Sequence, residues 1–199
     1  ALATLAFDSR RSKFFKKQLF ATIEMVSRGY IDAASLFGSW AGAMGQPQFI
    51  PSSYLVFAQD FDQDGRRDIW NNVGDVFASI ANYLARNGWS AGQTWGREVK
   101  VPRKLIDELG KPAVRAAPGC RARTSVRKRL PEWQALGVRG SDDSDLPSHN
   151  LRAALIMPDG KNGSTFLVYS NYAPIMAYNC AHLYAVTVGT LADRIGEQK

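Results

Sequence analysis

Cysteine and histidine are scarce in this 199-residue chain, which contains two of each. Cys120 and Cys180 do not have the spacing of metal ligands, which excludes a cysteine-based metal site. The same two residues can pair in an oxidising compartment, and the sequence leaves their disulfide open. His149 and His182 are too far apart in sequence to indicate a site, so each is expected to be a surface or packing residue.

Long apolar runs are also missing. No unbroken stretch of about 18 apolar residues occurs, which excludes a membrane-spanning helix. A hydrophobic fraction of 45% is typical of a soluble globular chain. The chain does not begin with Met and shows no signal peptide. Its length allows one sizeable core, or a core that carries a smaller domain.

Glutamate is rare in the first half of the chain, where Glu24 is the only one before residue 98. It lies on an amphipathic helix predicted at 9–29 and is interpreted as a helix-surface charge. A second helix is predicted at 73–86. Its apolar stripe comprises Val73, Val76, Phe77, Ile80 and Leu84.

The segment 38–54 reads GSWAGAMGQPQFIPSSY and cannot be an ordinary helix or strand. Glycine permits close backbone approach and positive φ, and proline fixes φ, so the chain must follow a tight path here. Ser39, Gln48 and Phe49 are then held at fixed places on a wall. The alternative is a close-packed corner between two helices.

An aspartate-rich loop follows this segment. Asp60, Asp62 and Asp64 occupy positions 1, 3 and 5, and Gly65 occupies position 6, as in the first half of an EF-hand calcium loop. The backbone carbonyl of Arg66 is the expected ligand at position 7. The alternative is a solvated acidic turn, but the spacing favours calcium.

The second half of the loop departs from the EF-hand pattern, because Asn71 stands at position 12 where a bidentate Glu is usual. Asp68 is expected to act directly or through water, and Asp75 is expected to complete the site if the loop is longer. The alternative for Asp75 is a capping role at the start of the helix, with Asn72 as N-cap.

Together, GSWAGAMGQPQFIPSSY, the aspartate-rich loop and IWNNVGDVFASIANYLARNGW resemble the B-type lytic murein transglycosylases, glycoside hydrolase family 103. ALATLAFD at 1–8 and AYNCAHLYAVTVGTLADRI at 177–195 extend the resemblance over most of the chain. It implies a mainly helical α+β fold: a lysozyme-like core at 1–96 with the EF-hand-like loop at 60–75, a small β-rich insert at 97–170, and a C-terminal helix at 171–199 returning to the core.

The resemblance also implies a sugar cleft and the roles of its walls. Ser39, Gln48 and Asn179 are expected as polar supports of the reaction. The expected stacking surfaces are Phe49, Tyr83, Tyr178 and Tyr184. Without the family, Tyr83 reads as a core-edge residue, and Tyr178, Asn179 and Tyr184 read as ordinary residues at the start of a helix whose buried stripe is Ala185, Val188, Leu191, Ala192 and Ile195.

The implied reaction cleaves the β-1,4 bond between N-acetylmuramic acid and N-acetylglucosamine in peptidoglycan and closes a 1,6-anhydro ring, with one carboxylic acid serving as acid and then base. The family's catalytic glutamate belongs to a motif upstream of ALATLAFD. We therefore expect it before Ala1, in a longer precursor, and expect the 199-residue chain alone to be inactive. Calcium is the expected structural ion, and no organic cofactor is expected.

The positive charge of the chain is local. Between Arg97 and Arg139 we count twelve Lys or Arg against four Asp or Glu, a net of +8 within a total of +7. Strands are predicted at 97–101, 151–157 and 165–169, the last two as a hairpin. The charge of this basic insert is suited to binding the carboxylates of peptidoglycan stem peptides, or to binding nucleic acid. No recognisable nucleic-acid motif supports the second partner.

Two rival functions stay open from sequence: a non-catalytic peptidoglycan-binding or scaffold protein, and a nucleic-acid-binding module that uses the basic insert. The family resemblance favours a periplasmic, monomeric enzyme, with an outer-membrane anchor in the missing N-terminal part as a further option.

Overall fold

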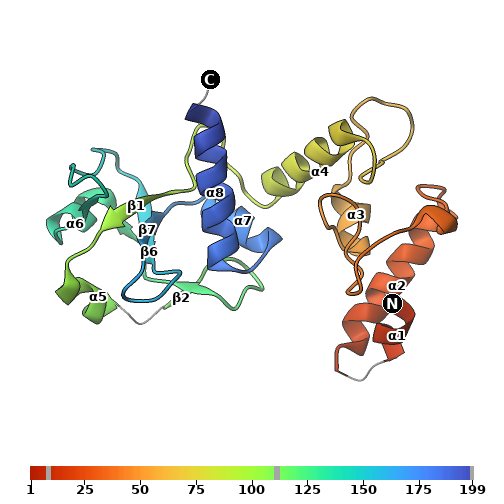
Figure 1. Ribbon diagram of the computed structural model, residues 1–199, viewed down its shortest axis with the longest axis horizontal. Helices are drawn as coiled ribbons and strands as arrows, with labels where there is room; N and C mark the ends of the chain where they lie inside the picture. Colours follow the sequence, from red (N-terminus) through yellow and green to blue (C-terminus); the bar gives the residue numbers. More distant parts are fainter. Residues whose placement is uncertain (8–9, 110–112, 198–199) are drawn as a thin grey trace. The chain divides into compact units, whose positions relative to one another are not determined.

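The computed structural model describes residues 1–7, 10–109 and 113–197. The chain forms two compact units, Ala1–Tyr83 and Leu84–Lys199. The first unit is helical (Figure 1). Its elements are α1 (Leu2–Phe7), α2 (Ser12–Ser27), the 3₁₀ turn η1 (Ala33–Ser35), α3 (Pro51–Phe57) and α4 (Val73–Arg86), whose last turn belongs to the second unit.

The helix predicted at 9–29 is α2, which begins at Ser12 and ends at Ser27. Ser9 lies outside the described residues. Gly29 has φ +70°, a left-handed conformation that glycine adopts without steric cost and that ends the helix where expected. The buried face of α2 consists of Phe15, Gln18, Ala21 and Met25.

Helix α4 is present as predicted, but its apolar stripe is not the buried face. Val73 and Phe77 are 53% and 67% exposed, whereas Asp75 and Ser79 are fully buried beside Val76. The hydroxyl oxygen of Ser79 accepts the backbone N–H of Gln59 at 2.9 Å. The predicted stripe was therefore wrong at Val73 and Phe77, because this helix turns polar side chains inward to bind the backbone of the preceding loop.

The second unit contains a five-stranded antiparallel sheet of order β4-β6-β7-β1-β5 and a separate ribbon of β2 and β3. Figure 1 labels β1, β6 and β7 of the sheet. The predicted hairpin forms, with Ala154 opposite Val168. The strands are β1 (Gly96–Lys100), β2 (Val114–Arg115), β3 (Arg123–Thr124), β4 (Lys128–Arg129), β5 (Arg139–Gly140), β6 (Arg152–Ile156) and β7 (Thr165–Val168). The helices are α5 (Arg103–Leu109), α6 (Leu130–Ala135), α7 (Tyr172–Tyr178) and α8 (His182–Glu197).

Both faces of this sheet are buried. On one face, Ile156 and Phe166 pack with Trp95 and with residues of α7 and α8. On the other, Leu155 and Leu167 pack around Trp133 of α6. Because side chains alternate along a strand, a sheet covered on both faces needs apolar residues at successive positions, as in β6 and β7.

The C-terminal helix predicted from 171 is two helices, α7 and α8, separated by residues 179–181. Of its predicted stripe, Ala185 is buried, but Leu191 and Ile195 are each 56% exposed. The stripe was wrong there because the buried side of α8 continues through Gly189, where a Cβ would lie 2.3 Å from the Trp95 ring. No described helix is long and apolar enough to cross a membrane.

Candidate functional site

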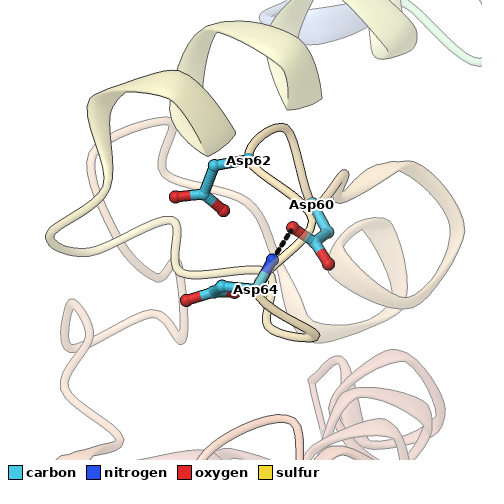
Figure 2. Close-up of side chains that lie close together, drawn as sticks. All are labelled: Asp60, Asp62 and Asp64. Atoms are coloured by element: carbon cyan, nitrogen blue, oxygen red, sulfur yellow. Dashed lines mark hydrogen bonds between the residues drawn. The ribbon is translucent and has the colours of Figure 1, made fainter.

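The carboxylates of Asp60, Asp62 and Asp64 converge in the loop between α3 and α4 (Figure 2), with one oxygen from each lying within 4.8 Å of the others. The Asp60 carboxylate accepts the N–H groups of Asp64 at 3.2 Å and Gly65 at 2.9 Å, which curls the loop around it. Gln63 and Gly65 adopt positive φ, as a sharp turn requires. Three carboxylates that approach this closely suit a hard cation such as calcium, which prefers oxygen ligands.

Asp68 and Asp75 bind backbone groups of the same loop. The two oxygens of buried Asp75 accept the N–H groups of Phe61 and Asp68, both at 2.7 Å. Burial opposes the charged form of Asp68, but the N–H groups of Asn71 and Trp70 donate to it, and its pKa lies below the usual value. The structure thus shows both residues organising the loop, and their service as calcium ligands stays a prediction.

Residues 38–50 form a tight loop, whereas residues 51–54 begin helix α3, so the expectation of a non-helical segment was wrong for its last four residues, where proline is tolerated at the first helical position. Short bridges join Gly38 to Met44 and Met44 to Phe49. The hydroxyl of Ser39 accepts the N–H of Ala43 at 3.0 Å, so the loop fixes the position of Ser39. Ser39 also lines a hollow of about 310 Å³.

Gly45 joins this loop to the aspartate-rich loop. A Cβ on Gly45 would lie 2.6 Å from the carbonyl oxygen of Ile69, so only glycine permits the contact. The neighbouring Gln46 N–H donates to the same carbonyl at 2.9 Å. Gln48 is exposed with φ +53°, and its side-chain amide donates to the Gly45 carbonyl at 2.8 Å. The conformation of the aspartate-rich loop therefore affects the position of Gln48, because Gly45 contacts that loop and accepts the hydrogen bond from Gln48.

Phe49 and Tyr83 lie together in the first unit, with ring centroids 5.8 Å apart. Phe49 is only 3% exposed, so in this structure it packs against Tyr83 as a buried residue. Tyr83 also lies 4.5 Å from the Phe57 ring, and partial burial raises the pKa of Tyr83. A stacking face of Phe49 for sugar stays a prediction.

Tyr178 and Tyr184 lie in the second unit with nearly parallel rings, 6.5 Å between centroids and 13° between planes. Partial burial raises the pKa of Tyr184. Asn179 is exposed in the turn between α7 and α8. The structure thus pairs Phe49 with Tyr83 in the first unit and Tyr178 with Tyr184 in the second, and the convergence of all the expected residues on a single groove stays a prediction.

Sequence reasoning left open or missed the contacts that hold the Asn179 turn. Cys180, the next residue, forms a disulfide with Cys120. The His182 ring contacts the Tyr172 hydroxyl at 2.6 Å and the Arg123 carbonyl at 2.9 Å. Burial lowers the pKa of His182, although the hydrogen bond to the carbonyl opposes this. The packing alternative for His182 is therefore the correct one.

Gln18 was also missed. Its side chain is 2% exposed, and its amide oxygen accepts the N–H of Ser52 at the start of α3. A polar residue that replaces an apolar one on the buried face of a predicted helix is the available signal for such a bond.

Comparison with known proteins agrees with these features. Residues 1–193 match the family described as the transglycosylase SLT domain. Membrane-bound lytic murein transglycosylase B of Escherichia coli (strain K12) is 31% identical over 196 residues, which cover 98% of this chain and 50% of that protein.

Solved structures give the same result. SltB3 from Pseudomonas aeruginosa in complex with NAG-anhNAM-pentapeptide matches with a TM-score of 0.86 and 44% identity over 97% of this chain and 49% of that one. The Escherichia coli lytic transglycosylase Slt35 in complex with calcium matches with a TM-score of 0.76 and 28% identity over 99% and 58%. This chain thus spans about half the length of these relatives. With nearly every residue covered by the family match and the fold shared, the chain belongs to the transglycosylase SLT domain family.

Proposed function

We propose that the protein is a peptidoglycan lytic transglycosylase that cleaves the bond between N-acetylmuramic acid and N-acetylglucosamine and forms a 1,6-anhydromuramic product. The family match across residues 1–193 carries this proposal. The complex of a 44% identical relative with NAG-anhNAM-pentapeptide supports the substrate class. The proposed location is the periplasm, with a membrane anchor outside this chain, since one relative is named as membrane-bound.

The chemistry requires a positioned carboxylic acid that protonates the leaving oxygen, a step worth about a hundred- to ten-thousand-fold in rate. We place this acid upstream of residue 1. Within the chain, Glu24 forms an ion pair with Arg28 at 2.6 Å on α2, and Asp75 is committed to backbone N–H groups. Glu24 is thus a paired charge on the helix surface, and Asp75 has a structural role in the loop.

Incubation with purified sacculi tests the placement of the acid. The chain alone should release no 1,6-anhydromuropeptides above a buffer control, and the chain with its upstream segment should release them. Product from the lone chain would show that one of its own carboxylates is the acid, with Glu24 and Asp32 as the first to replace. No product from either form would refute the proposed reaction.

The proposed glycan contacts are Tyr83, Tyr178 and Tyr184 for stacking, Ser39, Gln48 and Asn179 for polar contacts, and Phe49 as a further stacking surface. Support comes from the partly exposed Tyr83, which packs against Phe49, and from the paired rings of Tyr178 and Tyr184 next to the exposed Asn179. Tyr83→Ala and Tyr178→Ala should each weaken binding of a peptide-free N-acetylglucosamine oligomer about tenfold. Phe20→Ala, at a residue 67% exposed on α2, is the control and should bind normally. Equal binding by all three variants would contradict the proposed glycan contacts.

Calcium is proposed to bind Asp60, Asp62, Asp64 and the Arg66 carbonyl, with Asp68 or Asp75 completing the set. The convergence of three carboxylates supports this, as does the crystallisation of Slt35 with calcium. Saturating calcium should raise the thermal midpoint by several degrees. Asp60→Asn should abolish that rise, whereas Asp159→Asn, a surface change in the second unit, should keep it. No binding at millimolar calcium would remove the site.

A further inference from the structure

The sheet of the second unit carries a pair of cations directly across from each other at each of its two edges. At the β5 edge, Lys100 pairs with Arg139, and at the β4 edge, Arg129 pairs with Arg152. Like charges at directly opposed positions repel each other unless an anion lies between them. The same repulsion between like charges is therefore expected at both edges.

Among the described residues, carboxylates neutralise the paired cations at the β5 edge but not at the β4 edge. Lys100 forms an ion pair with Asp143, and Arg139 forms one with Asp145 at 3.4 Å. In the described residues, neither Arg129 nor Arg152 has a carboxylate within ion-pair distance. Glu132, the acid that follows β4, accepts the backbone N–H of Arg129. Both residues are exposed, so within the described residues the β4 edge keeps two cations side by side without an acidic partner.

The β2–β3 ribbon repeats this arrangement. Arg115 and Arg123 lie directly opposite each other, both exposed and without an acidic partner in the described part of the chain. Each donates one N–H group to a backbone carbonyl at 3.1 Å, which holds its side chain in place and leaves its other donors available. The chain from Arg123 to Arg129 spans at most about 20 Å. A short stretch of backbone thus connects the two arginine pairs.

We propose that these two arginine pairs form a surface, called here the arginine edge, that binds the carboxylates of peptidoglycan stem peptides. The inference rests on the proposed function and assigns to the second unit a contact with the peptide part of the substrate. Guanidinium groups bind carboxylates through two parallel hydrogen bonds, a geometry that lysine cannot provide, and all four residues are arginine. A bound carboxylate would also relieve the repulsion within each pair.

The residues of the stretch 113–156, which carries the arginine edge, favour a peptide over nucleic acid. Proteins that bind single strands combine positive charge with aromatic rings on which bases stack. None of the exposed aromatic side chains in the described residues lies between 113 and 156.

The test compares two double variants that remove the same charge from opposite edges of the sheet, Arg129→Gln/Arg152→Gln and Lys100→Gln/Arg139→Gln. Binding of a disaccharide-pentapeptide is titrated at low salt, together with the same ligand after amidation of its carboxylates. The variant in the arginine edge should bind the pentapeptide ligand about fivefold more weakly, as expected for two exposed charge contacts, and the control variant should bind it normally. The unaltered protein should bind the amidated ligand about fivefold more weakly, a measurement that does not depend on the folding of any variant.

Three results would overturn the arginine edge: equal losses in the two variants, equal binding of the amidated ligand, or tighter binding of a single-stranded DNA 20-mer that shows the same arginine dependence. A peptide-free N-acetylglucosamine oligomer separates this inference from the proposed function. If that oligomer binds while the carboxylates make no difference, only the arginine edge is wrong. If the oligomer fails to bind and sacculi yield no anhydro product, the proposed function is wrong as well.

Discussion

The Cys120–Cys180 disulfide closes a loop of 60 residues within the second unit. A cross-link around a loop of this size lowers the entropy of the unfolded chain by about 14 cal/mol/K, which corresponds to about 4 kcal/mol at 25 °C. Replacing both cysteines with alanine also removes the sulfur of Cys120, which is 4% exposed. Its burial contributes roughly 1 kcal/mol. The double variant should therefore lose about 4 to 5 kcal/mol of unfolding free energy.

Urea unfolding followed by tryptophan fluorescence measures this loss, because Trp95 and Trp133 are buried in the two clusters of the second unit. A reductant added to the unaltered protein should reproduce most of the loss, and the double variant should not respond to reductant. A loss below about 1 kcal/mol would refute the reasoning, because only the buried sulfur of Cys120 would then contribute.

Three further predictions follow from packing and protonation. Gly189→Ala should lower the free energy of unfolding by about 1 to 3 kcal/mol, because the added methyl clashes with the Trp95 ring. Gly196→Ala on the same helix places its methyl in open space and should raise the free energy of unfolding by about 0.5 to 1 kcal/mol. Thermal unfolding measures both changes. Because folding lowers the pKa of His182, its contribution to stability is complete above about pH 6.5 and declines as the pH falls toward the lowered value, and His182→Gln should reduce that slope in urea titrations. Asp75→Ala should cost at least about 3 kcal/mol in calcium-free buffer, since it orphans two backbone N–H groups; an equal stability with and without the carboxylate would contradict the structural role.

Local patterns predicted much of the fold. The helix at α2, its end near Gly29 and the hairpin of β6 and β7 all appear, because each depends on residues close together in sequence. The buried face of α4 could not be predicted this way. Its inward residues, Asp75 and Ser79, are polar and are satisfied by backbone groups of a loop that only the folded chain brings near.

Some features of the candidate site could likewise be predicted from local sequence, and others could not. The spacing of Asp60, Asp62 and Asp64 predicted their convergence, because in the EF-hand pattern positions 1, 3 and 5 direct their oxygens to one point and the following glycine makes the sharp turn. The burial of Phe49 against Tyr83 was not predictable. An irregular loop has no periodicity that reveals which of its side chains face the core.

The sequence alone determined the family, the aspartate-rich loop and the basic character of the β-rich segment, because motifs and charge are properties of residue order. The tertiary structure decided which cysteines meet and which cations are neutralised. Cys120 reaches Cys180, and Lys100 and Arg139 find Asp143 and Asp145. Arg129 and Arg152 face each other without an acid in the described chain. Strand register sets these pairings, and register follows from how the whole sheet buries both of its faces.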